Sequence, residues 1–343
     1  MGKPATLRKL ASWYERQKRV LPWRDNPSFY RVWISEIMLQ QTQVGTVIPY
    51  YQRFVDRFPS VTALAEAPVE AVIAHWAGLG YYARARNLHK CAQLVASQYG
   101  GRFPASAALL AELPGIGRST AAAVAAFAFG QRAAILDGNV KRVLCRQFGI
   151  EGFPGQAAIH RRLWDLAESL LPVDEIEPYT QGLMDLGATL CTRSRPRCAE
   201  CPVAAGCIAR RDGRQGELPA SKPRAAVPER ASTFVLISDG PRLLLERRPP
   251  SGLWGGLLVP PEGEPAAVLS RLGLTRLAEQ RLPAVKHTFT HFRLTLQPVL
   301  CRVLPSGAED ASGLEWVALE RAADAGVPAP IRKLIRQVAS ARG

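Results

Sequence analysis

Apolar residues recur at three- and four-residue spacing through the first two thirds of the chain, as in helices that bury one face. This spacing predicts helices over residues 6–20, 30–44, 46–57, 69–76, 82–99, 118–129, 139–147, 156–170 and 176–189. Prolines at 22 and 27 predict a loop between the first two helices. The first part of the chain is therefore expected to be all-helical.

The period changes after residues 210–230, a stretch rich in Arg, Gly and Pro that is typical of a linker. Beyond it, apolar segments predict strands over 234–237, 243–245, 256–259, 291–304 and 314–317, and helices over 264–272 and 330–340. A length of 343 residues fits two domains. We expect a helical domain over 1–209, a linker over 210–229 and an α+β domain over 230–343.

The charge is strongly basic, with a formal net charge of +15 and a pI near 9.9. Residues 1–225 carry 29 basic and 18 acidic side chains (+11), and the remainder carry 15 and 11 (+4). This balance indicates a polyanionic partner that binds mainly to the first domain. Apolar runs fall short of the roughly 18 residues that span a bilayer, and the N-terminus lacks a signal pattern, so we expect a cytoplasmic protein without a membrane partner.

The stretch 113–141 combines two features that suit nucleic-acid chemistry. A Pro-Gly-x-Gly turn holding Gly115 and Gly117 leads into an alanine-rich helix, whose unpaired N–H groups favour a bound phosphate. Asp137 precedes a second helix, where capped N–H groups should hold its carboxyl ionised. A plain pair of helices with an ordinary Asp cap is the alternative interpretation.

Glu36 is the second candidate carboxyl. Its helical neighbours include Val32, Trp33 and Leu39, so burial should raise its pKa towards neutrality. Paired with an ionised Asp137, it would form the acid and the electrostatic stabiliser or nucleophile of a glycosidic bond cleavage. Alone, Glu36 would more simply be a surface helix residue.

Four of the seven cysteines lie close together in a C-x6-C-x2-C-x5-C arrangement: Cys191, Cys198, Cys201 and Cys207. Four thiolates at such spacing bind zinc or an iron–sulfur cluster in a reducing compartment, and a single C-x2-C pair favours a 4Fe-4S cluster. Arg193, Arg195 and Arg197 lie inside the first loop of this segment and suit a phosphate backbone. A charged, solvated loop is the alternative.

The turn GLGYY at 78–82 places two aromatic rings before a basic run that includes Arg84, Arg86 and Lys90. An aromatic ring on such a turn can enter a base stack while the arginines hold phosphates. Nearby glutamines, Gln41 among them, offer amides that would fill the gap left by an extruded base. Ordinary packing and helix solubility would also explain both groups.

Together these segments resemble the adenine DNA glycosylases of the MutY type, within the helix-hairpin-helix superfamily that includes endonuclease III. The resemblance is carried by WISEIMLQQT at 33–42, GLGYYARAR at 78–86, LPGIGRST at 113–120, LDGNV at 136–140 and the four cysteines. It implies a multidomain repair enzyme: an all-α helix-hairpin-helix domain with an iron–sulfur loop, then an α+β Nudix-like domain. Because a single chain contains every part needed, we expect a monomer. The implied reaction excises adenine mispaired with 8-oxoguanine or guanine in double-stranded DNA and leaves an abasic site.

The resemblance also implies roles for individual residues. Glu36 would protonate the adenine ring, Asp137 would stabilise the sugar cation, and Asn139 would orient the site. The four cysteines would bind the 4Fe-4S cluster. Contacts to DNA would come from Gln41, Thr42, Tyr82, Arg84, Arg86, Leu113, Gly115, Gly117 and Lys141.

Ser119 separates two groups of relatives. Bifunctional members such as endonuclease III have a lysine here that cuts the strand through a Schiff base, which a serine cannot form. We therefore expect a monofunctional glycosylase, with at most weak lyase activity through Lys141. An endonuclease III-like enzyme for oxidised pyrimidines is the nearest rival, and a non-catalytic iron–sulfur DNA-binding protein is a rival of another class.

The second domain resembles the Nudix-like domain of these glycosylases. A Nudix hydrolase needs a Glu-rich helix to hold Mg²⁺, whereas residues 264–271 read EPAAVLSR, so a nucleotide pyrophosphohydrolase is disfavoured. Residues 286–292 resemble the loop that senses 8-oxoguanine, with Phe289, Thr290 and His291 where the family often has Phe-Ser-His. Ordinary strand histidines are the alternative for that loop.

Overall fold

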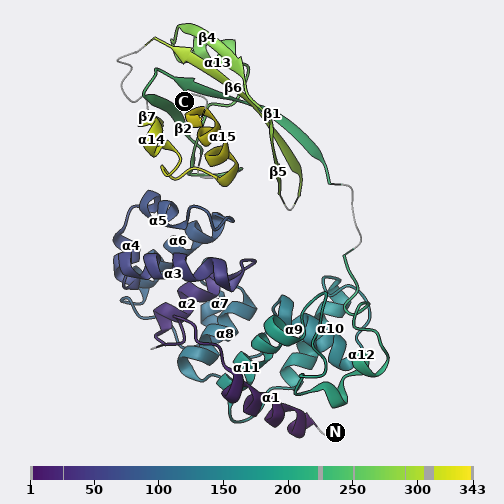
Figure 1. The fold of residues 1–343 in the computed structure, drawn as a ribbon. Helices are drawn as coiled ribbons and strands as arrows, with labels where there is room; N and C mark the ends of the chain where they lie inside the picture. Colours follow the sequence, from purple (N-terminus) through teal and green to yellow (C-terminus); the bar gives the residue numbers. More distant parts are fainter. Residues whose placement is uncertain are drawn as a thin grey trace. The chain divides into compact units, whose positions relative to one another are not determined.

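The computed structural model describes residues 3–25, 27–222, 227–249, 252–289, 291–304 and 313–340 (Figure 1). The chain divides into two compact units, one of Met1–Glu66 with Asn87–Arg224 and the other of Ala67–Arg86 with Ala225–Gly343. The domain boundaries expected from the sequence stay predictions. Within the described residues, no helix combines the length and apolar character needed to cross a membrane.

Helices build the first unit, as the apolar spacing predicted. They are α1 Lys3–Gln17, α2 Phe29–Leu39, α3 Val44–Arg57, α4 Val61–Glu66, α6 Ala83–Gln98, α7 Ala107–Ala111, α8 Arg118–Phe129, α9 Gly138–Phe148, α10 Ala157–Ser169, α11 Ile176–Asp185 and α12 Ile208–Arg211. A π-helical turn, η1 Leu186–Leu190, continues α11, and a short 3-10 turn, η2 Ala204–Gly206, precedes α12. The short helices α4 and α7 were not predicted.

The end of α2 differs from the sequence prediction and exposes a glutamine. The predicted helix 30–44 stops at Leu39, and α3 begins at Val44. Gln41 between them has φ 58°, a left-handed conformation that no continuous helix accepts. The break therefore presents Gln41 to solvent on a turn instead of along a helix face.

Small residues allow α8 to pack tightly. Its alanines 121–123 and 125–126, together with Val124, are buried, and α8 packs against α2, which carries Glu36. A second cluster joins α8 to α9, α10 and α11 through buried residues such as Val140, Leu163 and Leu183. Burial of this apolar surface fixes the relative positions of the helices that carry Glu36 and Asp137.

The second unit contains a mixed sheet. Its strands are β1 Glu229–Ser238, β2 Arg242–Arg247, β3 Leu258–Val259, β4 Arg276–Arg281, β5 Val285–Thr288, β6 Arg293–Val303 and β7 Leu314–Ala318. The order is β3-β2-β1-β6-β4, with β5 paired to β6 and β7 to β2. β1 runs parallel to β6 over its whole length, and the other pairs are antiparallel.

Helices of the second unit are α5 Val69–Trp76, α13 Pro265–Arg271, α14 Leu319–Ala322 and α15 Ala329–Ser340. Two apolar clusters lie in this unit: one contains Phe234, Leu296 and Ile331, and the other contains Val235 and Val299. Alternate residues of β1 and β6 thus face different cores, as the two-residue period of a strand requires. The α+β expectation is confirmed.

Candidate active site and DNA-contacting elements

A cavity of about 870 Å³ opens in the helical unit and gathers the predicted carboxyls. Glu36 of α2, Asp137 at the start of α9 and Asn139 all line it. The cavity walls also include the loop before α2, the start of α3 and α11. Three of the four residues predicted as catalytic therefore face one volume, although roughly a hundred positions separate Glu36 from the other two.

Glu36 carries a strongly perturbed carboxyl in this cavity. Its pKa is raised to about 7, mainly by burial and also by the negative charge of Asp137, while Arg24 partly opposes both effects. The direction and its main cause agree with the apolar neighbours in the sequence. Near neutral pH the group exists in both forms, so it can hold a proton and give it away.

Asp137 caps α9, as its position before Gly138 predicted. Its Oδ1 accepts a hydrogen bond from the Val140 amide at 2.7 Å, and Asn139 Nδ2 donates to Oδ2 at 3.4 Å. Burial nevertheless raises the pKa of Asp137, and these hydrogen bonds and Arg142 only partly offset it. The expected cap is present, but desolvation of the carboxyl is the larger effect, so the pKa of Asp137 lies above its ordinary value. That Asp137 is ionised stays a prediction.

Asn139 is fixed from the side opposite Asp137. Arg142 donates to Asn139 Oδ1 at 2.8 Å, to the Gly187 carbonyl at 2.7 Å and to the Cys191 carbonyl at 2.7 Å. Gly187 belongs to the π-helical turn, and a Cβ there would lie 2.6 Å from Asn139 Cβ. The turn can approach α9 this closely only because residue 187 has no side chain.

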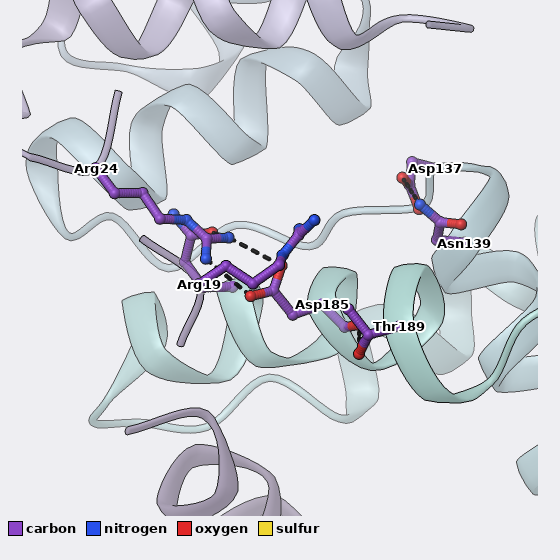
Figure 2. A network of polar contacts seen from close by, with 7 residues as sticks. Arg19, Arg24, Asp137, Asn139, Asp185 and Thr189 are labelled. Atoms are coloured by element: carbon purple, nitrogen blue, oxygen red, sulfur yellow. Dashed lines mark hydrogen bonds and ion pairs between the residues drawn. The ribbon is translucent and has the colours of Figure 1, made fainter. Parts of the chain in front are cut away.

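A partly buried pair of arginines in the same cavity was not predicted from the sequence. Arg24 donates to Asp185 Oδ2 at 2.8 Å and to Gln181 Oε1 at 2.6 Å, and Arg19 also pairs with Asp185 (Figure 2). Burial would raise the pKa of Asp185, but hydrogen bonds from Arg24 and Arg19 lower it overall. Asp185 therefore stays ionised and holds both arginines in the cavity wall, while Thr189 Oγ1 donates to its carbonyl.

Ser119 takes a supporting position on α8. Its Oγ accepts a hydrogen bond from the Leu136 amide at 3.0 Å, and it is not among the residues that line the cavity. The bond ties α8 to the residue that precedes Asp137. Ser119 thus helps to place the carboxylate instead of facing the cavity itself.

The predicted phosphate turn precedes α8. Gly115 has φ 78°, and a Cβ there would lie 2.7 Å from Asn87 Cβ, so the turn requires glycine. Gly117 is the N-cap of α8 and supplies no side chain to satisfy the first N–H groups. Both glycines are exposed, whereas the Leu113 side chain is buried, so residues 113–117 offer backbone groups to a ligand.

The turn 78–82 presents a different ring from the one predicted. Tyr82 is partly buried against the core of the second unit, and its hydroxyl accepts from the Gly78 amide at 3.3 Å. Tyr81 is 48% exposed and has φ 51°. A turn that holds a tyrosine in a left-handed conformation and points its ring to solvent makes Tyr81 the better placed aromatic contact.

Two arginines of this segment make internal hydrogen bonds. Arg84 donates to the carbonyls of Leu79 and Gly80, and its guanidinium lies 5.4 Å from the ring centres of Trp76 and Tyr81. Burial lowers the pKa of Arg84 to about 10. Arg86 donates to the Gly255 carbonyl at 2.8 Å. Their predicted contacts to DNA stay predictions, since here both side chains brace the turn and its neighbours.

All four cysteines of the 191–207 loop line one cavity, and none of them forms a disulfide. Arg146, which is 3% exposed, donates to Cys191 Sγ at 3.4 Å and to the carbonyls of Thr192, Arg193 and Leu218. Among the described residues no three acidic, histidine or cysteine side chains come together as ligands of a single ion. Four thiols nevertheless border one cavity, with the buried Arg146 beside Cys191.

In the second unit the predicted recognition segment is a hairpin instead of a loop. Its residues up to Thr288 form β5, which pairs with the start of β6. Phe289 donates its amide to the Phe292 carbonyl at 2.8 Å, and His291 is exposed. Thr290 lies outside the described residues. The helix α13 carries no acidic residue, consistent with the loss of Nudix metal ligands read from the sequence.

Comparison with protein families finds two matching models. Residues 34–169 match the HhH-GPD superfamily base excision DNA repair protein, and residues 232–337 match the NUDIX domain. The first match contains Glu36, Asp137, Asn139 and the phosphate turn, and the second contains the hairpin. These models cover the two segments that carry the candidate chemistry.

Curated proteins extend the similarity to nearly the whole chain. An adenine DNA glycosylase of Buchnera aphidicola subsp. Acyrthosiphon pisum is 35% identical over 332 residues, which cover 94% of this chain and 95% of that protein. The adenine DNA glycosylase of Homo sapiens is 35% identical over 404 residues, covering 95% and 72%. Among solved structures, a thermostable thymine-DNA glycosylase is 30% identical, with a TM-score of 0.56, over 61% of this chain and 97% of that one.

Proposed function

The chain belongs to the adenine DNA glycosylase family and is a DNA N-glycosylase, and we propose that it excises adenine mispaired with 8-oxoguanine or guanine. The observation that carries this proposal is the cavity in which Glu36, with a pKa of about 7, faces Asp137 and Asn139. Such a pair of carboxyls suits cleavage of an N-glycosidic bond at neutral pH.

The proposed chemistry is an acid-assisted departure of the base. Glu36 donates a proton to a ring nitrogen of adenine, so that the bond between the sugar and the base breaks with the electron pair leaving on the base. Asp137, the carboxyl with backbone hydrogen bonds, is the anion that stabilises the cationic sugar. Water adds to the sugar, its proton returns to the Glu36 carboxylate, and an abasic site remains.

Arg142 and Asn139 support this pair. Asn139 donates to Asp137 and accepts from Arg142, which is bound in turn to the carbonyl of Gly187. The chain of hydrogen bonds fixes the Asp137 carboxyl on one side of the cavity. A carboxylate that is already oriented needs no rearrangement when positive charge develops on the sugar.

Double-stranded DNA is the proposed substrate, and the adenine must leave the stack before it reaches the cavity. Backbone N–H groups at Gly115 and Gly117 would hold a phosphate, and Lys141 on α9 would supply a further cation for the DNA backbone. Gln41 and Thr42 on the turn after α2, and a tyrosine of the 78–82 turn, would fill the space that the base leaves. On exposure, Tyr81 is the stronger candidate for that ring, beside the Tyr82 that the sequence suggested.

The enzyme is proposed to be monofunctional. Position 119 holds a serine whose hydroxyl is engaged by the Leu136 amide, so this position offers no amine to form a Schiff base. Any residual strand cleavage would pass through Lys141. Abasic sites should therefore accumulate intact.

The four cysteines around the cavity of the 191–207 loop are proposed to hold a 4Fe-4S cluster. When bound, such a cluster supplies one-electron redox chemistry and crosslinks the loop. Arg142 would connect the cluster loop to the active site, because it donates hydrogen bonds to both the Cys191 carbonyl and Asn139. The second unit, through Phe289, Thr290 and His291, would recognise the 8-oxoguanine opposite the adenine.

The test is cleavage of matched duplexes that hold A opposite 8-oxoguanine, A opposite G, or thymine glycol opposite A, each with and without alkali. Adenine release from the first two, with strand breaks only after alkali, is expected. Breaks at thymine glycol without alkali would contradict the proposal and indicate an endonuclease III-like enzyme. Tight binding without any cleavage would indicate a non-catalytic DNA-binding protein.

A further inference from the structure

The first residues of β1 lie along the recognition hairpin of the second unit. β1 pairs with β6 from its first residue, with Glu229 opposite Arg293, while β5 pairs with the same part of β6 from the other side. The Arg293 amide also donates to the Pro228 carbonyl at 2.8 Å. The chain thus forms a three-stranded edge, with β6 in the middle, immediately after the linker (Figure 1).

A column of aromatic rings runs from the core of this unit to the hairpin. Phe234 is fully buried and lies 5.9 Å from Trp254, and Trp254 lies 5.8 Å from Phe289. Phe289 stacks on Phe292 at 4.7 Å with an interplanar angle of 24°. Each ring position therefore depends on the next, and the two hairpin phenylalanines are held against the core from one end.

Arg230 closes the other end of the column. Its guanidinium carbon lies 4.7 Å from the centre of the Phe292 ring, within the range of a cation–π contact. The neighbouring Glu229 pairs with Arg293 at 3.2 Å, which ties β1 to the first residue of β6. All three charged side chains are exposed, and none of them enters the cores of the unit. Their contacts serve the hairpin and not the stability of the sheet interior.

We propose that Arg230 is a positioning residue for recognition of the base opposite the excised adenine. By capping Phe292, its guanidinium holds the Phe289–Phe292 stack in one arrangement and so sets the orientation of His291, which directly precedes Phe292. Arg230 does not touch the base. This inference deepens the proposed function, because it rests on the hairpin as the sensor of 8-oxoguanine.

The test compares rates of adenine release from A opposite 8-oxoguanine and A opposite G under single-turnover conditions. Arg230→Ala should lower the ratio of the two rates by about two- to tenfold, the fold-change expected for loss of one cation–π contact. The loss should fall on the 8-oxoguanine duplex. Arg230→Lys keeps a cation over the ring and should restore part of the ratio.

Arg242→Ala is the matched control, because Arg242 lies 5.1 Å over the Trp316 ring in the same unit but on β2 and β7, away from the hairpin. It should leave the ratio unchanged. Near-UV circular dichroism of all variants reports whether the aromatic column survives.

Three outcomes would overturn the inference. If the wild type prefers 8-oxoguanine and Arg230→Ala keeps the same preference, the role of Arg230 is refuted, while recognition of 8-oxoguanine by the protein is not. An equal loss on both duplexes, with a weaker salt dependence of binding, would make Arg230 a phosphate contact instead. A wild-type ratio near one would refute recognition of 8-oxoguanine, and the role of Arg230 with it.

Discussion

Protonation of Glu36 should control the rate of adenine release. Burial raises the pKa of this carboxyl to about 7, and the active form is the protonated acid. Because a raised carboxyl pKa preserves the acid at higher pH, activity should be complete below the pKa and lost as the pH rises through it. The protonated fraction falls from about nine tenths at pH 6 to about one tenth at pH 8, so the rate should fall about tenfold between them.

The appropriate quantity is kcat/KM, since its pH dependence reports groups of the free enzyme. The rate of adenine release is measured from pH 5 to 9 on a duplex with A opposite G, at a duplex concentration that does not saturate the enzyme. DNA binding is measured by anisotropy at each pH. Glu36→Gln cannot donate a proton and should lose about 10²–10⁴ of the rate, with no midpoint near 7. Glu66→Gln, at an exposed carboxylate on α4, is the matched control and should keep both rate and midpoint.

Asp137→Asn tests the cause of the shift. The charge of Asp137 raises the pKa of Glu36, so its removal should move the midpoint of the residual activity to lower pH. A rate that rises above pH 7, or a midpoint near 7 that survives Glu36→Gln, would refute the assignment of Glu36 as the acid. Weaker DNA binding that accounted for the whole fall at high pH would refute it equally.

Three further substitutions test parts of the site. Gly187→Ala would push a methyl group into Asn139 and should lower the rate of adenine release by up to about a hundredfold with DNA binding retained. Gly216→Ala, at an open position, is the control and should keep the wild-type rate. A Gly187→Ala rate equal to that of the wild type would refute the close packing of residue 187 against Asn139. Gly115→Ala should weaken duplex binding, measured by anisotropy, because its left-handed turn cannot accept a Cβ; unchanged affinity would exclude this turn from the DNA contact. Arg146→Leu removes the donor to the carbonyls of Leu218, Thr192 and Arg193, and of these bonds only the one to Leu218 is buried. The substitution should cost about 1–3 kcal/mol of unfolding free energy, measured by urea denaturation, and an unchanged midpoint would show that these bonds add nothing.

Local signals in the sequence were sufficient for much of the helical unit. Asp137 before Gly138 predicts a helix cap, and the alanine run of α8 predicts a tightly packed helix, and both are present. The apolar neighbours of Glu36 predict its raised pKa. These inferences hold because each depends on residues within one or two helical turns.

Long-range and solvent-facing features were not predictable in the same way. The pairing of Arg24 with Asp185 joins residues 161 positions apart, and neither residue stands in a recognisable motif. The strand β4 exposes every residue, so it lacks the alternation by which strands are recognised. The pKa of Asp137 depends on burial by distant parts of the chain as well as on its local cap, so the cap in the sequence could not reveal that the pKa is raised.

The most direct measurement is the release of free adenine from a duplex with A opposite 8-oxoguanine, quantified against abasic sites, for the wild type and Glu36→Gln. We expect one adenine for each alkali-labile site, an intact strand before alkali and faster release than from A opposite T. Glu36→Gln should lose most of this activity and keep duplex binding. Equal release from A opposite T, or full activity of Glu36→Gln, would contradict the proposed function.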